Sequence, residues 1–223
     1  MDIYVLRVIF SFLPEESRNT IYKTCRFYRS QYLWVNPTDS FKKCLEFKNR
    51  KLANSIWDFC YLTGYMKVDR DFFQYCCKYD HSIAVSQFLL DSRIDPSAVN
   101  NYAIRCASSN GHLAVIERLL QDHRVDPSAE NNYAIRLASL NGHLAVVERL
   151  LQDLRVDPSA EDNYAIRLAS QNGQFSVVER LLQDPRVDPS ADNNYVIRWA
   201  SYNGHLSVVE RLLQDPRVNL KNK

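Results

Sequence analysis

The sequence predicts an all-α protein, a solenoid of stacked helical hairpins with short connections and a small helical cap at its N-terminal end. Three observations support this fold class. One unit of 31 residues recurs without a change of period, its apolar residues follow the spacing of a buried helix face, and the helices it implies are too short to be stable alone. Stacking of units is therefore required for stability.

The period is set by the tetrapeptide Asp-Pro-Ser-Ala. It begins four times at intervals of 31 residues, at Asp95, Asp126, Asp157 and Asp188. Four regular units therefore fill residues 95–218, and residues 219–223 form a tail. A fixed period over more than half of a chain is typical of a repeat architecture.

Each unit begins with a turn and a first helix. The Asp-Pro-Ser of residues 126–128 favours a turn, because Pro presets its backbone angle and Asp and Ser bond to nearby backbone groups. Asn132 lies where a helix N-cap belongs, and residues 133–139 are compatible with a helix. The Asn-Gly of residues 141–142 is a C-terminal stop signal, since Gly adopts the left-handed conformation easily.

A second helix is expected to begin near His143. Four apolar residues have the spacing of one buried face: Leu144, Val147, Leu150 and Leu151. Glu148 and Arg149 fall on the other face. Helices of about 7 to 10 residues are marginal alone in water, so each unit must cover the apolar face of its neighbour.

Upstream of Asp95 the pattern weakens without vanishing. Residues from 64 to 94 align with a regular unit once one residue is skipped near Asp91, which predicts a degenerate fifth unit. The apolar stretches 41–47 and 52–62 indicate a sixth. Residues 36–94 are therefore expected to form degenerate units, as end units commonly diverge.

The regular units resemble a known family. Residues 133–143, Tyr-Ala-Ile-Arg-Leu-Ala-Ser-Leu-Asn-Gly-His, are similar to the ankyrin-repeat signature TPLHLAAxxGH, and the Val-Val-x-x-Leu-Leu of the second helix matches as well. The DPSA…NNYAIR…NGH variant resembles the ankyrin arrays abundant in giant DNA viruses and their relatives. The resemblance implies L-shaped units of two antiparallel helices and a projecting finger, stacked into a curved array that binds other proteins on its concave face.

Two departures from the ankyrin pattern change these expectations. The unit has 31 residues where the family usually has ~33, and the missing pair falls between Leu151 and Tyr164, which predicts a short finger without a full hairpin. The Thr and His of TPLH, which tie neighbouring units in the family, are here Tyr133 and Arg136. The contacts that this Thr and His make between units in the family are therefore not expected in this chain.

An arginine and a tyrosine recur in every regular unit. The columns are Arg105, Arg136, Arg167 and Arg198, and Tyr102, Tyr133, Tyr164 and Tyr195. A stripe of arginines could bind phosphates, but every unit also supplies Asp and Glu. We therefore expect the arginines to pair locally with carboxylates or backbone carbonyls, and the tyrosines to pack.

Comparison of the copies with one another predicts where a partner protein would bind. Most positions are identical, and the resemblance places two varying columns at the finger and at the end of the first helix, the usual contact positions. These candidate binding residues are Val99, Ser109, Glu130, Leu140, Glu161, Gln171, Asp192 and Tyr202. Drift at unconstrained exposed positions would give the same pattern, so both explanations stay open.

A third varying column falls at a core position of the signature. Its members are Cys106, Leu137, Leu168 and Trp199. Trp199 belongs to the last regular unit, and we expect it to pack at that end of the array. A monomer is expected, with end-to-end association through this unit as the alternative.

Residues 3–30 do not fit the repeat and resemble an F-box. The residues that carry the resemblance are Ile9, Phe10, Leu13, Pro14 and Cys25. In that family a three-helix element docks on the Skp-type adaptor of cullin ubiquitin ligases. Residues 1–35 are therefore expected to be an F-box-like helical segment.

Departures from the F-box pattern leave a second explanation open. The first Leu-Pro of the motif is missing, and Arg18 and Thr24 stand where the family prefers Leu and Val. An ordinary helical cap on the first unit would use the same apolar residues. Between Lys78 and Lys221 the chain has no lysine, which would limit self-ubiquitination of an adaptor, although duplication of an arginine-bearing unit gives the same result.

Composition excludes several classes of protein. A net charge of +2, with 46% hydrophobic and 24% charged residues, is ordinary for a soluble globular chain and gives no reason to expect nucleic-acid binding. The apolar stretch 3–13 is too short to span a membrane, and Asp2 and Arg7 argue against a signal peptide. Scattered cysteines without a CxxC pair indicate a reducing compartment, so we expect the cytosol and leave the nucleus open.

The sequence predicts no catalytic residues, no metal site and no cofactor. Cys76 and Cys77 with His81 are the best catalytic candidates, but nothing nearby orients the histidine. His112, His143 and His205 recur one per unit without clustered ligands.

These observations predict a protein–protein interaction module. In one form it is an adaptor that recruits substrates to a cullin-type ubiquitin ligase. In the other it is a stand-alone ankyrin scaffold or inhibitor with no role in ubiquitination.

Overall fold

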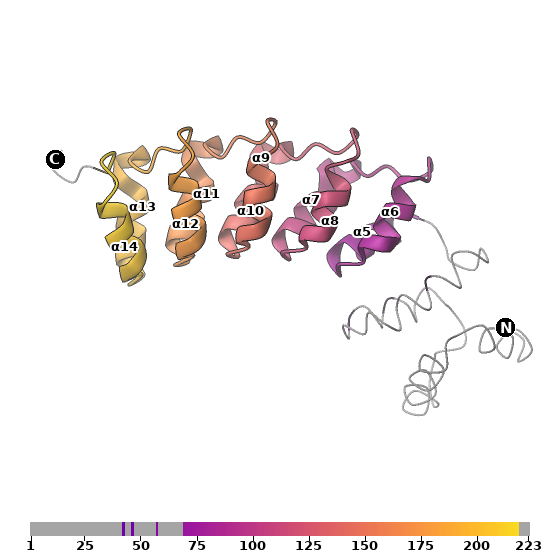
Figure 1. Ribbon diagram of the computed structural model, residues 1–223, viewed down its shortest axis with the longest axis horizontal. Coiled ribbons are helices and arrows are strands. Elements are labelled where there is room, and N and C mark those ends of the chain that lie inside the picture. Colours follow the sequence, from indigo (N-terminus) through magenta and orange to yellow (C-terminus); the bar gives the residue numbers. More distant parts are fainter. Residues whose placement is uncertain (1–41, 43–45, 47–56, 58–68, 219–223) are drawn as a thin grey trace, which may run out of the picture.

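The computed structural model describes residues 69–218, together with the single residues Lys42, Glu46 and Trp57. Within residues 69–218 there are ten helices and no strand (Figure 1). They are α5 (Arg70–Lys78), α6 (Ser82–Leu89), α7 (Ala98–Ser109), α8 (Leu113–Leu119), α9 (Ala129–Leu140), α10 (Leu144–Leu151), α11 (Ala160–Gln171), α12 (Phe175–Leu182), α13 (Ala191–Tyr202) and α14 (Leu206–Leu213).

The helices form two layers. The first helices of the units pack side by side in the order α5, α7, α9, α11, α13, and the second helices pack in the order α6, α8, α10, α12, α14. The segments that connect successive units lie along one edge of the row (Figure 1). One continuous apolar core runs through all five units. The predicted all-α solenoid of helical hairpins is confirmed.

The second helix of each unit forms as its apolar spacing predicts. In α10, Val147, Leu150 and Leu151 are buried, and Leu144 is partly buried against the core. Val146 is buried as well. The helix begins directly after His143, as expected.

The start of the first helix differs from the expectation. Glu130, Asn131 and Asn132 have φ angles of 56°, 55° and 61°, so a left-handed turn precedes the right-handed helix. Asn132 does not cap its own helix. Its side-chain oxygen accepts from the backbone N–H of Asp157 in the next unit at 2.8 Å. Asn and Asp tolerate the left-handed conformation better than other non-glycine residues, which accounts for their repetition in this turn.

The connection between units is a short turn without strands in residues 69–218. The carboxylate of Asp126 accepts from the backbone N–H of Ser128 at 2.9 Å and from its hydroxyl at 2.6 Å. The same pair of bonds recurs at Asp157 and Asp188. The shortened finger is thus confirmed, held by the Asp-Pro-Ser turn that the sequence predicts.

The degenerate unit formed by α5 and α6 keeps the full period of 31 residues. His81 precedes α6 as His112 precedes α8, and Asp80 has a φ of 62° where Gly111 has 75°. The skipped residue expected near Asp91 was therefore wrong, since the left-handed Asp80 takes the place of the glycine and no insertion is needed. The proposed sixth unit and the F-box-like residues 1–35 lie outside the described residues, apart from Lys42, Glu46 and Trp57.

None of the helices that the structure describes has the length and apolar character needed to cross a bilayer.

Candidate functional site

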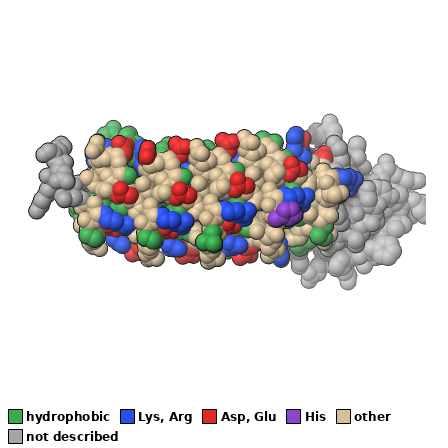
Figure 2. All heavy atoms as spheres, turned by 90° about the horizontal axis from the view of Figure 1, so that it is seen from above, with side chains coloured by type: hydrophobic (Ala, Val, Ile, Leu, Met, Phe, Trp, Pro, Cys, Tyr) green, Lys and Arg blue, Asp and Glu red, His purple; other side chains and the backbone are tan. Residues whose placement is uncertain are grey.

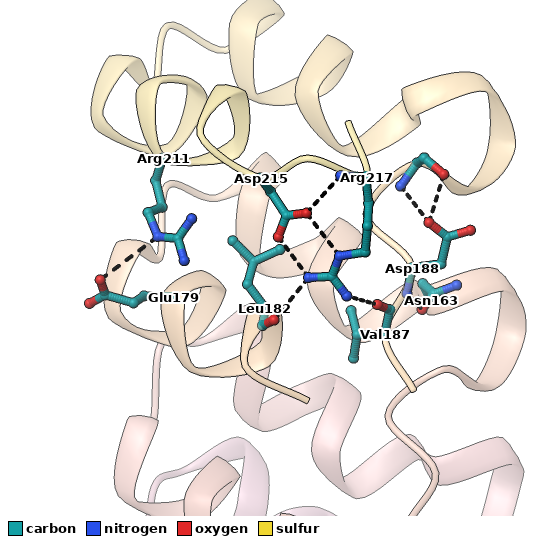
Figure 3. Close-up of polar contacts among 9 residues, drawn as sticks. Asn163, Glu179, Leu182, Val187, Asp188, Arg211, Asp215 and Arg217 are labelled. Atoms are coloured by element: carbon teal, nitrogen blue, oxygen red, sulfur yellow. Dashed lines mark hydrogen bonds and ion pairs between the residues drawn. The ribbon is translucent and has the colours of Figure 1, made fainter. Parts of the chain in front are cut away.

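An Asp–Arg pair joins each unit to the one before it. The guanidinium of Arg217 bonds to the carboxylate of Asp215 and donates to two carbonyls of the preceding unit, Val187 O at 2.7 Å and Leu182 O at 2.9 Å (Figure 3). The corresponding arginines donate in the same way: Arg124 to Ile94 O and Leu89 O, Arg155 to Val125 O, and Arg186 to Val156 O. The carboxylate fixes the guanidinium so that it spans the junction.

These arginines shift the titration of their carboxylates. The hydrogen bond from Arg186 lowers the pKa of Asp184, and Arg217 does the same to Asp215. In the degenerate unit, Arg93 lowers the pKa of Asp91 to about 2. The ionised form of each carboxyl is therefore the one that the fold requires.

A histidine or glutamine forms a second junction contact. The Nε2 of His143 lies 3.1 Å from Ser109 O, and that of His205 lies 2.9 Å from Gln171 O, both in the preceding unit. Gln174 replaces the histidine in one unit and donates to Leu140 O at 3.2 Å. His112 contacts Lys78 O in the same manner. The recurring histidines are thus structural, and no group of three metal-ligating side chains occurs among the described residues.

Tyrosine and arginine side chains alternate along the first-helix layer. The guanidinium of Arg136 lies between the rings of Tyr133 and Tyr164, 5.1 and 4.7 Å from their centroids. Arg167 lies between Tyr164 and Tyr195, at 5.2 and 4.0 Å. The ladder is completed by Arg105 against Tyr102 and Tyr133, and by Arg198 against Tyr195. A planar, weakly hydrated guanidinium suits this stacking, which couples adjacent units.

The expected local pairing of this arginine column is confirmed, and Arg136 takes part by donating to Asn131 O at 3.4 Å. Arg105 donates to Val99 O at 3.0 Å, Arg198 donates to Asp192 O at 3.2 Å, and Arg167 lies 3.7 Å from the Asp192 carboxylate. The stacking between tyrosine rings was missed, although the fixed Tyr-x-x-Arg spacing in every copy was a signal for it. These arginines are tied into the array and do not form a free basic stripe.

The two columns of candidate binding residues lie at opposite ends of the first helices. Val99, Glu130, Glu161 and Asp192 open the left-handed turns and are exposed. Asn100 donates to Glu130, and Asn131 donates to Glu161. The other column ends the helices, with Ser109, Leu140 and Gln171 partly buried by the following unit and Tyr202 82% exposed. The two columns therefore flank the Tyr–Arg ladder without forming one compact patch.

The last unit carries an aromatic cluster. Trp199 lies 5.4 Å from the ring of Tyr195 and 5.6 Å from that of Tyr202. Trp199 is partly buried in this cluster, in line with the expected packing at this end. The exposed Tyr202 extends the cluster into solvent.

The cysteine candidates for catalysis lack the required environment. Burial raises the pKa of the Cys76 and Cys77 thiols well above their ordinary value, so both remain protonated. The Nδ1 of His81 accepts from the backbone N–H of Ala84 at 3.1 Å and caps α6. Cys76, Cys77 and Cys106 are free and buried, as expected of small core residues.

The residues that form the junctions were only partly foreseen. The side chains of Asn101, Asn132 and Asn163 accept from the backbone of the next unit, and the arginine that follows each second helix donates to the unit before it. Both sets are invariant among the copies, and this invariance was the signal for a structural role. The sequence does not show, however, which unit each side chain contacts.

Acidic and basic side chains run in rows along the array on the side that carries the connections (Figure 2).

Comparison with protein families gives a match over more than half of the chain. The family model described as ankyrin repeats (3 copies) matches residues 73–162 and 135–222. A comparison with curated proteins found no match.

Proposed function

The chain belongs to the ankyrin-repeat family, and on that premise we propose that it binds a protein target along its first-helix layer. Ankyrin repeats are protein–protein interaction modules, so the class of function follows from the family. The face we assign comprises the exposed residues of the left-handed turns, the Tyr–Arg ladder and the aromatic cluster of the last unit.

One observation carries this proposal. The Asp–Arg pairs that join the units are invariant among the four copies, whereas the turn position at Val99, Glu130, Glu161 and Asp192 changes and is exposed. The turn geometry does not require these particular residues, because its three φ angles are the same in every copy. A variable, exposed side chain on a fixed turn is what selection for one partner would produce.

The strongest anchor that we assign on this face is Tyr202. Its side chain is exposed and is supported by Trp199, and tyrosine, tryptophan and arginine dominate the binding energy of many protein interfaces. A rigid aromatic side chain loses little conformational entropy on binding.

Proximity labelling in the native cell tests the proposed face. The full chain, the variant Tyr202→Ala and the matched control Leu154→Ala are compared, since Tyr202 and Leu154 are both highly exposed apolar residues. We expect Tyr202→Ala to lose the partners that the full chain labels and Leu154→Ala to keep them. Equal labelling by both variants would exclude Tyr202 as an anchor.

We also propose that residues 1–35 dock on a Skp-type adaptor, so that the array selects proteins for ubiquitination in the cytosol, with the nucleus as the alternative location. Support comes from the F-box resemblance at Ile9, Phe10, Leu13, Pro14 and Cys25, which lie outside the described residues. The absence of lysine between Lys78 and Lys221 is consistent with an array that the recruited ligase does not ubiquitinate.

A stand-alone scaffold or inhibitor is the second candidate function. The missing first Leu-Pro and the residues Arg18 and Thr24 favour it, because they depart from the F-box pattern. Co-purification distinguishes the two. The adaptor role predicts near-stoichiometric recovery of a Skp-type protein that is lost in Leu13→Ala/Pro14→Ala, and no recovery with the unaltered chain supports the stand-alone role.

A further inference from the structure

A groove lies between the second helices of the first two described units. It has a volume of about 670 Å³. One side is formed by α6 and the turn that follows it, and the other side by α8 and the turn that follows it. Six of its lining residues matter here: Ser86, Leu89, Leu90, Arg118, Gln121 and His123. We call it the α6–α8 groove. It belongs to the second-helix layer and is separate from the face assigned above.

The groove lacks a carboxylate that the repeat places at the same point elsewhere. At the junction of the last two units, the guanidinium of Arg211 lies 3.8 Å from the carboxylate of Glu179 (Figure 3). Arg118 is the residue equivalent to Arg211, three periods earlier, and Ser86 occupies the position equivalent to Glu179. A serine thus faces the arginine where a glutamate stands in the later junction.

Arg118 is therefore available to a ligand. Its guanidinium has no hydrogen bond and no ion pair with the described residues, and the residue is exposed. The neighbouring Arg124 is different, because it is held by Asp122 and donates to Leu89 O and Ile94 O. His123, which is also exposed, replaces the Leu154, Pro185 or Pro216 of the later units and adds a polar ring beside Arg118.

Two leucines form the apolar part of the groove, and the one carboxylate of its lining, Asp122, is paired with Arg124. Leu90 is 82% exposed, and Leu89 is partly buried against the core. The position of Leu90 is held by glutamine in all four regular units, at Gln121, Gln152, Gln183 and Gln214. The first junction thus has a hydroxyl in place of a carboxylate and an apolar side chain in place of an amide, and both residues line the same groove.

We propose that the α6–α8 groove binds an acidic segment of a partner protein. An Asp or Glu side chain of the partner pairs with Arg118, as Glu179 pairs with Arg211, and an adjacent apolar side chain lies on Leu89 and Leu90. Charge complementarity selects a carboxylate, and the two leucines select a peptide over a free anion.

Binding of two labelled peptides to the full chain tests this inference. The probe is a short peptide of alternating Leu and Glu, and its counterpart has Gln in place of Glu. Fluorescence anisotropy gives the dissociation constant at about 50 mM and about 500 mM salt, because the ion pair is screened at the higher concentration. We expect binding of the Glu peptide at low salt and at least about tenfold weaker binding of the Gln peptide.

Three variants locate the site, with folding of each checked by circular dichroism. Arg118→Gln removes the guanidinium, and Ser86→Glu supplies the missing carboxylate from within the chain, so each is expected to weaken binding of the Glu peptide about tenfold. Arg149→Gln makes the same change one unit later and is expected to leave binding unaltered.

The proposal is overturned if the Gln peptide binds as well as the Glu peptide, or if Arg118→Gln and Ser86→Glu bind like the unaltered chain. Displacement of the peptide by free glutamate at an equal concentration would also overturn it, since the leucines would then contribute nothing.

Discussion

At the scale of single residues, Gly111 and Gly173 each form a pair with a histidine of the next unit, His143 and His205. Gly173 has a φ of +69°, and a Cβ added there would lie 2.6 Å from Nδ1 of His205 in the next unit. The backbone angle alone favours glycine, but the neighbouring ring also requires it. The Asn-Gly signal in the sequence therefore has two causes, of which only the first is local.

Comparison of Gly173→Ala with Gly204→Ala separates these causes. Gly204 has a φ of +76° with nothing within 4 Å of an added Cβ, so its substitution should cost only the backbone strain, about 1 kcal/mol. Gly173→Ala adds the displacement of His205 and should lower the free energy of unfolding by about 1 to 2 kcal/mol more. Urea unfolding of the full chain measures both. Equal costs would show that the histidine ring is not held against the glycine.

At the scale of elements, the turn after each second helix is held by the Asp–Arg pair. Asp184 fixes Arg186, whose Nη1 donates to Val156 O of the preceding unit at 2.8 Å. Neither residue acts alone, because a guanidinium without its carboxylate would lose its orientation. The strength of this contact depends on the ionisation of the aspartate.

Acid should therefore weaken the array. The pKa values of Asp122, Asp153, Asp184 and Asp215 are lowered in the folded chain, and that of Asp91 falls to about 2. A carboxyl near pKa ~3.9 in the unfolded chain then binds protons before the folded one, so the stabilisation is complete above about pH 4 and is lost as the pH falls toward 2. Urea unfolding measured across this range checks the direction.

Substitution of one aspartate tests the assignment. Asp184→Asn should lower the free energy of unfolding by about 2 kcal/mol at pH 7 and flatten its decline in acid. Asp162→Asn is the control, since Asp162 is exposed in a turn and forms no ion pair with other described residues. If both variants keep the same acid dependence as the unaltered chain, other carboxyls are responsible.

At the scale of the whole molecule, stability is a property of stacking. The buried residues of each unit face the next unit as much as their own, and one apolar core continues from α5 to α14. Where a following unit no longer covers the surface, exposure rises: Leu182 is 6% exposed, while the equivalent Leu213 is 53% exposed. A repeat array of this kind gains stability with every neighbour that is added.

A single unit should consequently be unfolded. A synthetic peptide of residues 126–156 contains helices too short to persist without neighbours, so far-UV circular dichroism should show little helix in water. The full chain at the same concentration provides the comparison. A peptide with the helix content of the folded array would contradict the view that stacking, and not local propensity, stabilises the units.

Most of the fold could be predicted from the sequence. The second helices and the glycines that end the first helices depend on local spacing, so they can be recognised within one copy. The period follows from the repetition of that copy. The left-handed turn at Glu130 to Asn132 could not be predicted, because the same asparagines also suit a normal N-cap. The Tyr–Arg ladder and the Asp–Arg junction join residues of different units, and their partners are not specified by the spacing within one.

The sequence by itself determined that this chain is a helical repeat array of the ankyrin type, because periodicity and turn chemistry are local properties. Only the tertiary structure decided how the units are joined and which side chains remain free. The side chain of Asn132 bonds to the next unit, and the guanidinium of Arg136 lies between two tyrosine rings. The guanidinium of Arg118 has no partner among the described residues. These contacts join residues of different units, so they are determined by how the units stack and not by the spacing of residues within one unit.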